Sequence, residues 1–507
     1  MPKPDAMPMD ACPLTAAEQR RNLLLFGANI GLIYLGAPVL YVGLTQAALL
    51  QHLGASNTFA NLPSSFYFWM TPLPILAAWW FHRSRQIKPV IAGCFLLAAL
   101  GGLLVAGTLV FPTPAWAAAM LRGLNARLPE PLQVPIHWSA PVVLLHSALL
   151  GGVLVTVSAF QWVVIGKGVA ESRRGKVLAL AFGVGPLLAV ASALACQLIF
   201  SGSLELPTLW QGHQPWRMEI APLAFPGNFA VLFAATTPIL GLAALLSMKF
   251  VLPPPDADEQ AARESFFDGV LAGFGGFFSN RLILLASICL ILVGSGYSII
   301  NNFTLSTSSV VAKGEKAEVN EVKEPEEPAN DVKPPADKKP ENATQYVGYQ
   351  HAIRFAFKAV GGLLLGWLLS LTHPKAGMLV TAGFCLASVL WVQAVAGQWI
   401  AGVAGKWFLL SFGLIGIGEL FGVYFPNYIL SCSPKSQMRR NMSFTGMLNM
   451  PTAFAPLLFG LIADSVAAAT EDPAAGFIAS FWVAVTILCA ALALVLVLPT
   501  RPEPSGE

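Results

Sequence analysis

The chain has 507 residues, of which 55% are hydrophobic and only 11% are charged, and its formal net charge is +3. Soluble domains contain about 25% charged residues, and a soluble protein with so few would expose large apolar patches to water. The composition therefore excludes soluble enzymes and nucleic-acid-binding proteins as first hypotheses, and it indicates a membrane protein.

The N-terminal segment 1–22 is polar and rich in proline, so it is predicted to be a cytoplasmic tail and not a cleaved signal peptide. Twelve apolar segments follow, each close to the roughly 20 residues that cross a membrane as a helix. Backbone groups need partners inside lipid, so all twelve are predicted to be helical. They cover residues 23–49, 59–81, 89–111, 139–164, 177–200, 227–251, 281–304, 346–371, 376–397, 406–431, 442–464 and 476–499.

Lys and Arg residues of the short loops are concentrated on one side of this topology. If the N-terminus is cytoplasmic, the short outside loops contain only Arg122, Arg127, Arg217 and Lys406. Because cytoplasmic loops carry the excess of Lys and Arg, both termini are predicted to be cytoplasmic. We expect an integral multi-pass protein of the plasma (inner) membrane.

Two polar segments divide the chain further. Residues 252–280 combine acidic residues with phenylalanines at helical spacing, which predicts an amphipathic linker at the cytoplasmic surface. Residues 313–345 hold nine acidic residues against six lysines, many prolines and no aromatic residue, so we expect a disordered insertion outside the membrane. A solvated insertion without function is favoured over a partner-binding tail. The predicted domains are an N-terminal six-helix lobe at 23–251, a C-terminal lobe at 281–499 and a cytoplasmic tail at 500–507.

The two predicted lobes contain matching sequences in corresponding places. Ala92–Gly93, after the second helix, match Ala382–Gly383 after the eighth. Arg173–Arg174, after the fourth helix, match Arg439–Arg440 after the tenth. Repeats of six helices in the same direction are typical of two-lobed transporters.

These loops resemble the signature loops of the major facilitator superfamily. The basic part of the family's loop between helices 2 and 3 corresponds to His82, Arg83, Arg85 and Lys88. The resemblance implies an all-α membrane fold of twelve helices in two parallel lobes, which transports by alternating access around a central cavity lined by helices 1, 4, 7 and 10. The cytoplasmic gate loops would then contain Arg83, Arg85, Lys88, Arg173, Arg174, Arg439 and Arg440.

A fainter resemblance concerns the tenth predicted helix. Gly418–Glu419–Leu420, followed by Ser433–Pro434–Lys435, is similar to the Gly-Glu-Leu segment of proton-coupled peptide transporters. In that family the glutamate contacts the substrate amino group. The Glu-x-x-Glu-Arg pattern of that family's first helix is absent from this chain.

Three ionisable residues are predicted to lie deep in the membrane, where each costs about 2.5–3.5 kcal/mol to insert. Arg354 and Lys358 are four residues apart and share a helix face, and Glu419 lies near the middle of the tenth helix. We expect one cation to pair with Glu419 and the other to remain for an anionic substrate group, while Glu419 binds an amine or a coupling proton. The alternative is a buried ion pair that only joins two helices.

Two other ionisable residues are assigned lesser roles. His146 is a lone histidine among apolar residues, and a packing role is favoured over a proton relay. Asp464 is predicted to be a solvated helix end. Polar residues of the cavity helices are candidate substrate contacts, although hydrogen bonds between helices are an equally good explanation for some of them. They are Asn29, Tyr34, Tyr41, Gln161, Tyr297, Asn301, Asn302, Tyr424 and Asn427.

We therefore predict a secondary active transporter that moves a small polar, anionic or zwitterionic solute and is coupled to protons. The alternatives are a proton-independent facilitator and a transport-inactive receptor or sensor with the same fold. No Walker-type loop, HExxH or GxSxG motif indicates an enzyme. The seven scattered cysteines form no CxxC pair, so neither a disulfide framework nor a metal site is predicted. We expect no cofactor, and a monomer in the lipid bilayer whose partners are its solute and H⁺.

Overall fold

The computed structural model describes residues 14–81, 83–170, 180–206, 216–253, 274–307, 346–397, 399, 405–432 and 444–500. Four of the predicted gate arginines, Arg173, Arg174, Arg439 and Arg440, lie outside the described residues. So do the insertion 313–345, most of the linker and most of both predicted tails.

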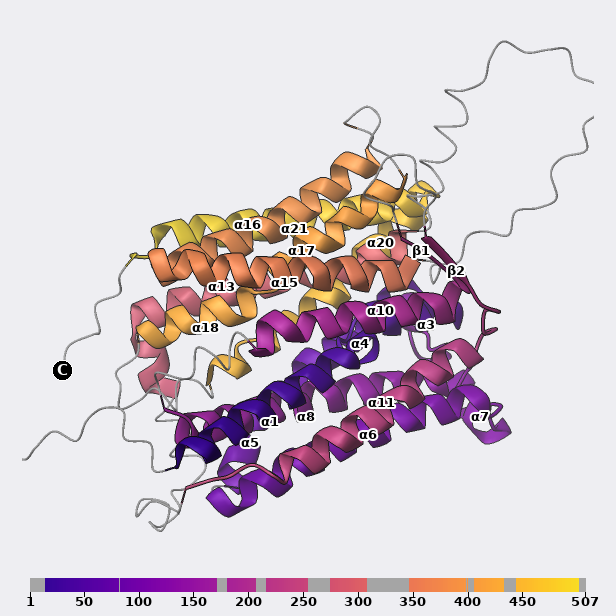
Figure 1. Ribbon diagram of the computed structural model, residues 1–507. Helices are drawn as coiled ribbons and strands as arrows, with labels where there is room; N and C mark the ends of the chain where they lie inside the picture. The colour runs from indigo at the N-terminus through magenta and orange to yellow at the C-terminus, as the bar shows by residue number, and fades with distance from the viewer. Residues whose placement is uncertain are drawn as a thin grey trace, which may run out of the picture.

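Long helices run side by side along one direction and form a bundle (Figure 1). The first half of the chain forms α1 (Ala16–Leu35), α2 (Ala37–Leu40), α3 (Leu44–His52), α4 (Asn57–Trp69), α5 (Leu73–Trp80), α6 (Ile87–Val110), α7 (Ala115–Asn125), α8 (Ser139–Gly168), α10 (Gly185–Ser201), the antiparallel hairpin β1 (Ser203–Leu206) and β2 (Trp216–Glu219), and α11 (Gly227–Ser247). The second half forms α13 (Arg281–Tyr297), α15 (Val347–Leu371), α16 (Pro374–Ala396), α17 (Leu410–Gly418), α18 (Phe421–Ser431), α20 (Phe454–Thr470) and α21 (Pro473–Val497).

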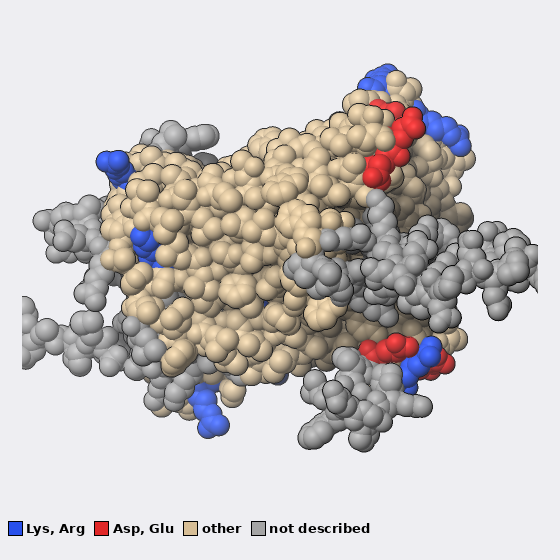
Figure 2. All heavy atoms as spheres, turned by 90° about the horizontal axis from the view of Figure 1, so that it is seen from above, with Lys and Arg blue, Asp and Glu red and all other residues tan. Residues whose placement is uncertain are grey.

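The two ends of the bundle differ. We call the end where α1 begins and α21 finishes the terminal end, and the end that carries the β1–β2 hairpin the far end (Figure 1). On the face seen in Figure 2, Lys, Arg, Asp and Glu side chains gather toward these two ends, and the surface between them is almost free of charge. Eight helices in the described part of the chain are long and apolar enough to cross a membrane. The chain is an integral multi-pass membrane protein.

Several predicted spans are interrupted helices, because glycine and proline end one helix and start the next. The span predicted at 23–49 is divided into three helices at Gly36 and again before α3. Gly43 at the second break has φ of 140°, a conformation that requires glycine. The predicted span 406–431 changes helix after Gly418, so Glu419 lies in a break and not within a continuous helix.

The eleventh span is longer than the sequence predicts. The prediction ends it at residue 464, but α20 continues to Thr470, because the small residues that follow Asp464 are compatible with a helix. Asp464 therefore lies more than one turn inside the helix, on a side that packs against α4. This difference decides the role of Asp464, which is described below.

The halves of the chain meet along the middle of the bundle. One apolar cluster, with Phe26, Phe95 and Phe250, lies within the first half, and a larger cluster joins residues of both halves. The helix pairs that pack most extensively across the boundary are α10 with α15 and α4 with α20. Hydrogen bonds also connect the two halves; for example, Asn301 donates to Ser64 (2.9 Å).

Candidate functional site

Glycines bring α15 and α17 into close contact and so create the place where the deep charges meet. A Cβ atom on Gly416 would lie 2.1 Å from the carbonyl oxygen of Arg354. Gly413 and Gly361 are in similarly close contact with Phe357 and Ile417 of the opposite helix. Because the two backbones approach so closely, side chains one turn along α15 reach the helix break that holds Glu419.

Arg354, Lys358 and Glu419 form a single buried cluster, which we call the charge cluster. Arg354 Nε and Lys358 Nζ each lie 2.9 Å from a different oxygen of the Glu419 carboxylate. The three side chains are only 3%, 7% and 12% exposed. Both cations therefore pair with Glu419, and the prediction that one of them would be left over is wrong. The reason is that the carboxylate has two oxygens and the helix break presents both to α15.

One donor of the charge cluster lacks a partner. Arg354 Nη2 donates to the Tyr297 hydroxyl (2.5 Å), but Arg354 Nη1 is buried and has no hydrogen-bond partner among the described residues. A buried guanidinium nitrogen without a partner is costly, so this atom marks a place for an acceptor. The cluster also retains a net charge of +1, since two cations face one carboxylate.

Aromatic rings from the N-terminal lobe cover the charge cluster. The Tyr41 ring centroid lies 5.4 Å from the Arg354 guanidinium and 5.0 Å from Lys358 Nζ, within the range of cation–π attraction. Tyr34 also contacts Lys358 (5.5 Å), and Phe355 meets both tyrosine rings edge to face. Tyr34 and Tyr41 do not share one continuous helix; the fold brings them together across the breaks after α1 and α2.

Most of the other candidate contacts lie away from the charge cluster. Asn29 donates to Ser247 of α11 inside the N-terminal lobe. Gln161 is buried in α8, and neither of its amide atoms has a hydrogen-bond partner among the described residues. Tyr424 packs against Gly377 at the α16–α18 contact, and Asn427 is exposed.

Asn301 and Asn302 form hydrogen bonds with other helices. Asn301 donates to Ser64, and Asn302 accepts from Asn61 (2.7 Å) and donates to Ser480 (2.9 Å). The described hydrogen bonds of these two residues are those of interhelical contacts, which agrees with the alternative explanation given for them.

The structure also places the lone histidine and those predicted gate residues that it describes. Arg83 and Arg85 are exposed and Lys88 is half-buried at the start of α6, toward the terminal end. His146 is buried against Gly101 and the Phe233 ring, inside the N-terminal lobe, and neither ring nitrogen has a hydrogen-bond partner among the described residues. A Cβ on Gly101 would lie 2.8 Å from His146 Nδ1, so the glycine provides room for the ring.

Near the lobe boundary, one residue escaped the sequence reasoning and another was given the wrong role. His351, one turn before Arg354, stacks on Phe355, and its Nε2 lies 3.3 Å from Thr45 Oγ1 of the N-terminal lobe. The rule that selects His146, an ionisable side chain inside an apolar span, also applies to His351. The prediction that Asp464 is a solvated helix end is wrong, because its carboxylate accepts hydrogen bonds from Asn57 and Thr58.

Comparisons of the fold identify its architecture. The chain is similar to a mutant of the nucleoside transporter NupG, with a TM-score of 0.59, 11% identity, and coverage of 94% of this chain and 99% of that chain. It is also similar to a POT family transporter in complex with 5-aminolevulinic acid, with a TM-score of 0.57, 12% identity and coverage of 94% and 95%.

A third similar structure carries the family name. It is the major facilitator superfamily transporter FucP in the outward conformation, with a TM-score of 0.51, 14% identity and coverage of 94% and 99%. The chain has the major facilitator fold. No protein-family model matches the sequence, and no curated protein matches it. At this level of identity the likeness concerns the fold, and it agrees with both resemblances drawn from the sequence.

Proposed function

We propose that this chain is a secondary transporter that moves a small polar solute with an anionic group by alternating access. The observation that supports it is the buried Arg354 Nη1, which has no hydrogen-bond partner among the described residues, in a cluster of net charge +1. A carboxylate or phosphate oxygen at this atom would supply the missing acceptor and balance the charge. The cluster lies between two lobes of a fold whose similar structures are named as transporters.

The pairing within the cluster favours an anion over an amine as the group recognised. Both oxygens of Glu419 already accept from a cation at 2.9 Å. A substrate ammonium would have to displace Arg354 or Lys358 and leave that cation buried without a partner, which is strongly unfavourable. An anion at Arg354 Nη1 would replace no hydrogen-bond partner of that nitrogen among the described residues. A zwitterion remains compatible if its ammonium lies outside the cluster.

The same pairing provides a way to couple the solute to a proton. A proton on Glu419 would remove the charge that holds Arg354 and Lys358, and both cations would then be available to an anion. Binding of the proton and binding of the anion would therefore strengthen one another by the same factor. We accordingly propose movement of the anion together with H⁺. A transport rate that does not depend on pH would instead support a facilitator.

Thermal stabilisation of the purified protein by a panel of small carboxylates and phosphates identifies the solute, and Arg354→Gln tests the site. We expect the variant to bind the stabilising anion at least tenfold more weakly. Hydrogen bonds to charged groups contribute about 1.5–3 kcal/mol, and about 1.4 kcal/mol is a factor of ten. Uptake of that anion into proteoliposomes should be lost as well.

Arg122→Gln is the matched control, because Arg122 is an exposed arginine of α7, remote from the charge cluster. It should bind and transport like the wild type. Unchanged anion affinity in Arg354→Gln would reject the proposed site, and binding without transport by the wild type would favour a receptor.

A further inference from the structure

Two helices that begin at the far end receive caps from the opposite lobe. The first N–H groups of a helix have no partner inside the helix and need one elsewhere. In α4 the backbone N–H groups of Asn57 and Thr58 donate to the two oxygens of Asp464, at 3.1 and 2.8 Å. In α15 the N–H of Tyr349 donates to Gln197 Oε1 of α10, at 3.2 Å. In both cases the capping side chain belongs to the other lobe.

The two caps correspond to one another in the repeat. In the order of predicted spans, α4 and α15 are the second helices of their lobes, and α10 and α20 are the fifth. Each cap depends on a glycine where the helices touch. A Cβ on Gly460 would lie 2.5 Å from Thr58 Cα, and one on Gly348 would lie 2.5 Å from Gln197 Cα. The internal repeat therefore builds a corresponding contact twice, with the glycine on the capping helix α20 in one case and on the capped helix α15 in the other.

The two caps are unequal in strength. Asp464 also accepts from the Asn57 amide (2.9 Å) and the Thr58 hydroxyl (2.6 Å), so one carboxylate accepts four hydrogen bonds. A negative charge at a helix N-terminus gains from the helix dipole. Gln197 is neutral, and its described contact with the backbone of α15 is the hydrogen bond from the Tyr349 N–H group. Asp464 is therefore the stronger of the two connections.

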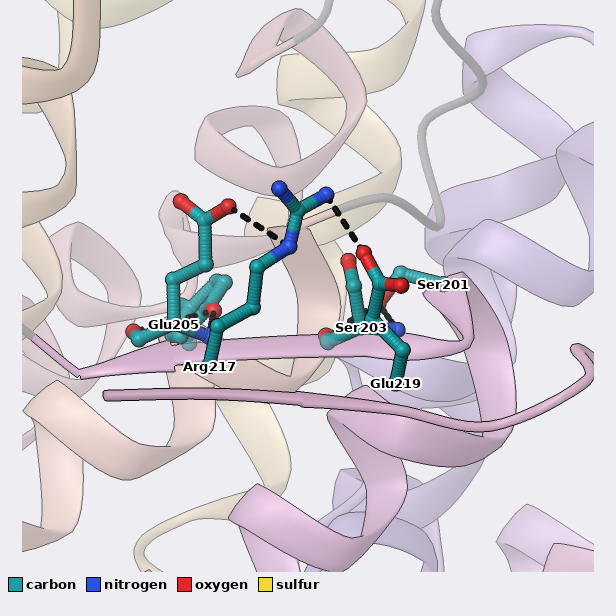
Figure 3. Close-up of polar contacts among 6 residues, drawn as sticks. Ser201, Ser203, Glu205, Arg217 and Glu219 are labelled. Atoms are coloured by element: carbon teal, nitrogen blue, oxygen red, sulfur yellow. Dashed lines mark hydrogen bonds and ion pairs between the residues drawn. The ribbon is translucent and has the colours of Figure 1, made fainter. Parts of the chain in front are cut away.

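The weaker cap is supported by the hairpin. The Tyr349 hydroxyl accepts from the N–H of Glu205 (2.8 Å) and lies 3.2 Å from its carbonyl oxygen. Figure 3 shows Arg217 of β2 between the carboxylates of Glu205 and Glu219, at 3.4 and 2.7 Å. The ion pair with Glu205 connects β2 to β1, whereas Glu219 belongs to β2 itself. The hairpin thus connects the N-terminal lobe to the start of α15, little more than one turn before Arg354.

We propose that Asp464 is the main latch that holds the two lobes together at the far end. Any opening of that end must separate α4 from α20 and break all four hydrogen bonds of Asp464. On the α15 side, opening would also separate Tyr349 from α10 and His351 from Thr45, on the helix that carries Arg354 and Lys358. The strength of the latch therefore sets the proportion of molecules with an open far end, without any contact to the charge cluster.

Spin labels placed across the far end test this proposal on the purified full-length protein in lipid nanodiscs without a solute. Glu130 and Ala469 are exposed, lie in opposite lobes and are suitable positions for Cys labels. The background has Cys12, Cys94 and Cys489 replaced by Ser; of these, Cys94 is half-buried and Cys489 is exposed. The measured quantity is the distribution of distances between the labels.

We expect Asp464→Asn to raise the ratio of far-end-open to far-end-closed molecules about tenfold, which corresponds to about 1.4 kcal/mol. Glu471→Gln removes the same charge from an exposed residue of the same region and should leave the distribution unchanged. Thr58→Val removes one of the four hydrogen bonds and should shift the distribution in the same direction by less. It also serves if Asp464→Asn does not fold.

The proposal would be overturned if Asp464→Asn gave the same distance distribution as Glu471→Gln. If Asp464→Asn does not fold, the same comparison is made between Thr58→Val and Glu471→Gln. Because no solute is present, the result does not depend on Arg354 or on the proposed substrate. A shifted distance distribution together with unchanged anion affinity would show that Asp464 controls opening of the far end without contributing to the anion site. A failure of the anion hypothesis would leave the expected shift unchanged.

Discussion

The buried charge cluster and the contacts at the far end use polar groups in opposite ways. In the cluster three charges come from the C-terminal lobe, two against one, and a buried guanidinium nitrogen lacks a hydrogen-bond partner among the described residues. At the far end Asp464 accepts four hydrogen bonds across the lobe boundary. One region is electrostatically incomplete, whereas the other has its carboxylate fully engaged.

This difference indicates what each region does. A buried site that lacks a hydrogen-bond acceptor is stabilised when a ligand supplies one, so the stability of the protein depends on the solute. A contact whose hydrogen-bonding groups are all paired is not stabilised by a ligand; its hydrogen bonds are either formed or broken. Under the two proposals made above, binding and closure rest on different residues, so variants should affect one without the other.

Glu419→Gln should have the largest effect, because it leaves two buried cations without their partner. Breaking a buried ion pair costs about 3–5 kcal/mol, so the thermal midpoint of the empty protein should fall sharply. Anions of the proposed class should restore much of the loss and should bind with little dependence on pH. Thermal unfolding with and without the anion, at two pH values, measures both effects.

Glu471→Gln is again the matched control for that experiment and should unfold like the wild type. If Glu419→Gln were as stable as this control, the two cations would have other partners, and the comparison drawn above would fail.

Gly416→Ala should have the next largest effect, since the added Cβ would lie 2.1 Å from the Arg354 carbonyl oxygen. Overpacking of this kind costs about 1–3 kcal/mol, and it should push α15 away from α17. Anion affinity should fall although every charged residue is retained. Isothermal titration with the anion measures the loss.

The control for this change is Gly422→Ala in α18, where a Cβ meets nothing within 4 Å. Alanine is the better helix former, so this variant should be as stable as the wild type or slightly more stable. Equal affinities in the two variants would show that the close contact of α15 and α17 does not position the cluster.

Tyr41→Leu should have the smallest effect of the three. It removes a ring 5.0 Å from Lys358 Nζ and 5.4 Å from the Arg354 guanidinium. Cation–π contacts contribute about 0.5–2 kcal/mol, so we expect a few-fold loss of anion affinity, whereas Tyr41→Phe keeps the ring and most of the affinity. Equal anion affinities for Tyr41→Leu and Tyr41→Phe would show that the Tyr41 ring of the N-terminal lobe does not contribute to the site.

Much of the architecture could be predicted from the sequence. Long apolar segments require helices in lipid, and few ionisable residues lie within them, so the sequence alone identifies Arg354, Lys358 and Glu419. The positions at which the helices are interrupted were harder to predict from the sequence. Gly43 and the break after Gly418 depend on packing against distant residues, such as Asn301 beside Gly43.

Asp464 shows most clearly what could not be predicted from the sequence. The predicted span ends at Asp464, which suggests a solvated helix end, and nothing in the neighbouring sequence indicates that the start of α4 lies beside it. Asn57 and Asp464 are 407 residues apart, and only the approach of α20 through Gly460 brings them together.

The sequence by itself determined that this is an integral membrane protein. It also determined how many apolar segments the chain has and which three charged residues of the cluster lie inside them. The physical reason is that lipid penalises each unpaired polar group locally, so composition along the chain reveals it. The tertiary structure alone decided which of these groups pair, which buried nitrogen lacks a hydrogen-bond partner among the described residues, and which carboxylate joins the lobes. Pairing depends on distances of a few ångströms between segments far apart in the chain, and these are set by glycine contacts and helix breaks.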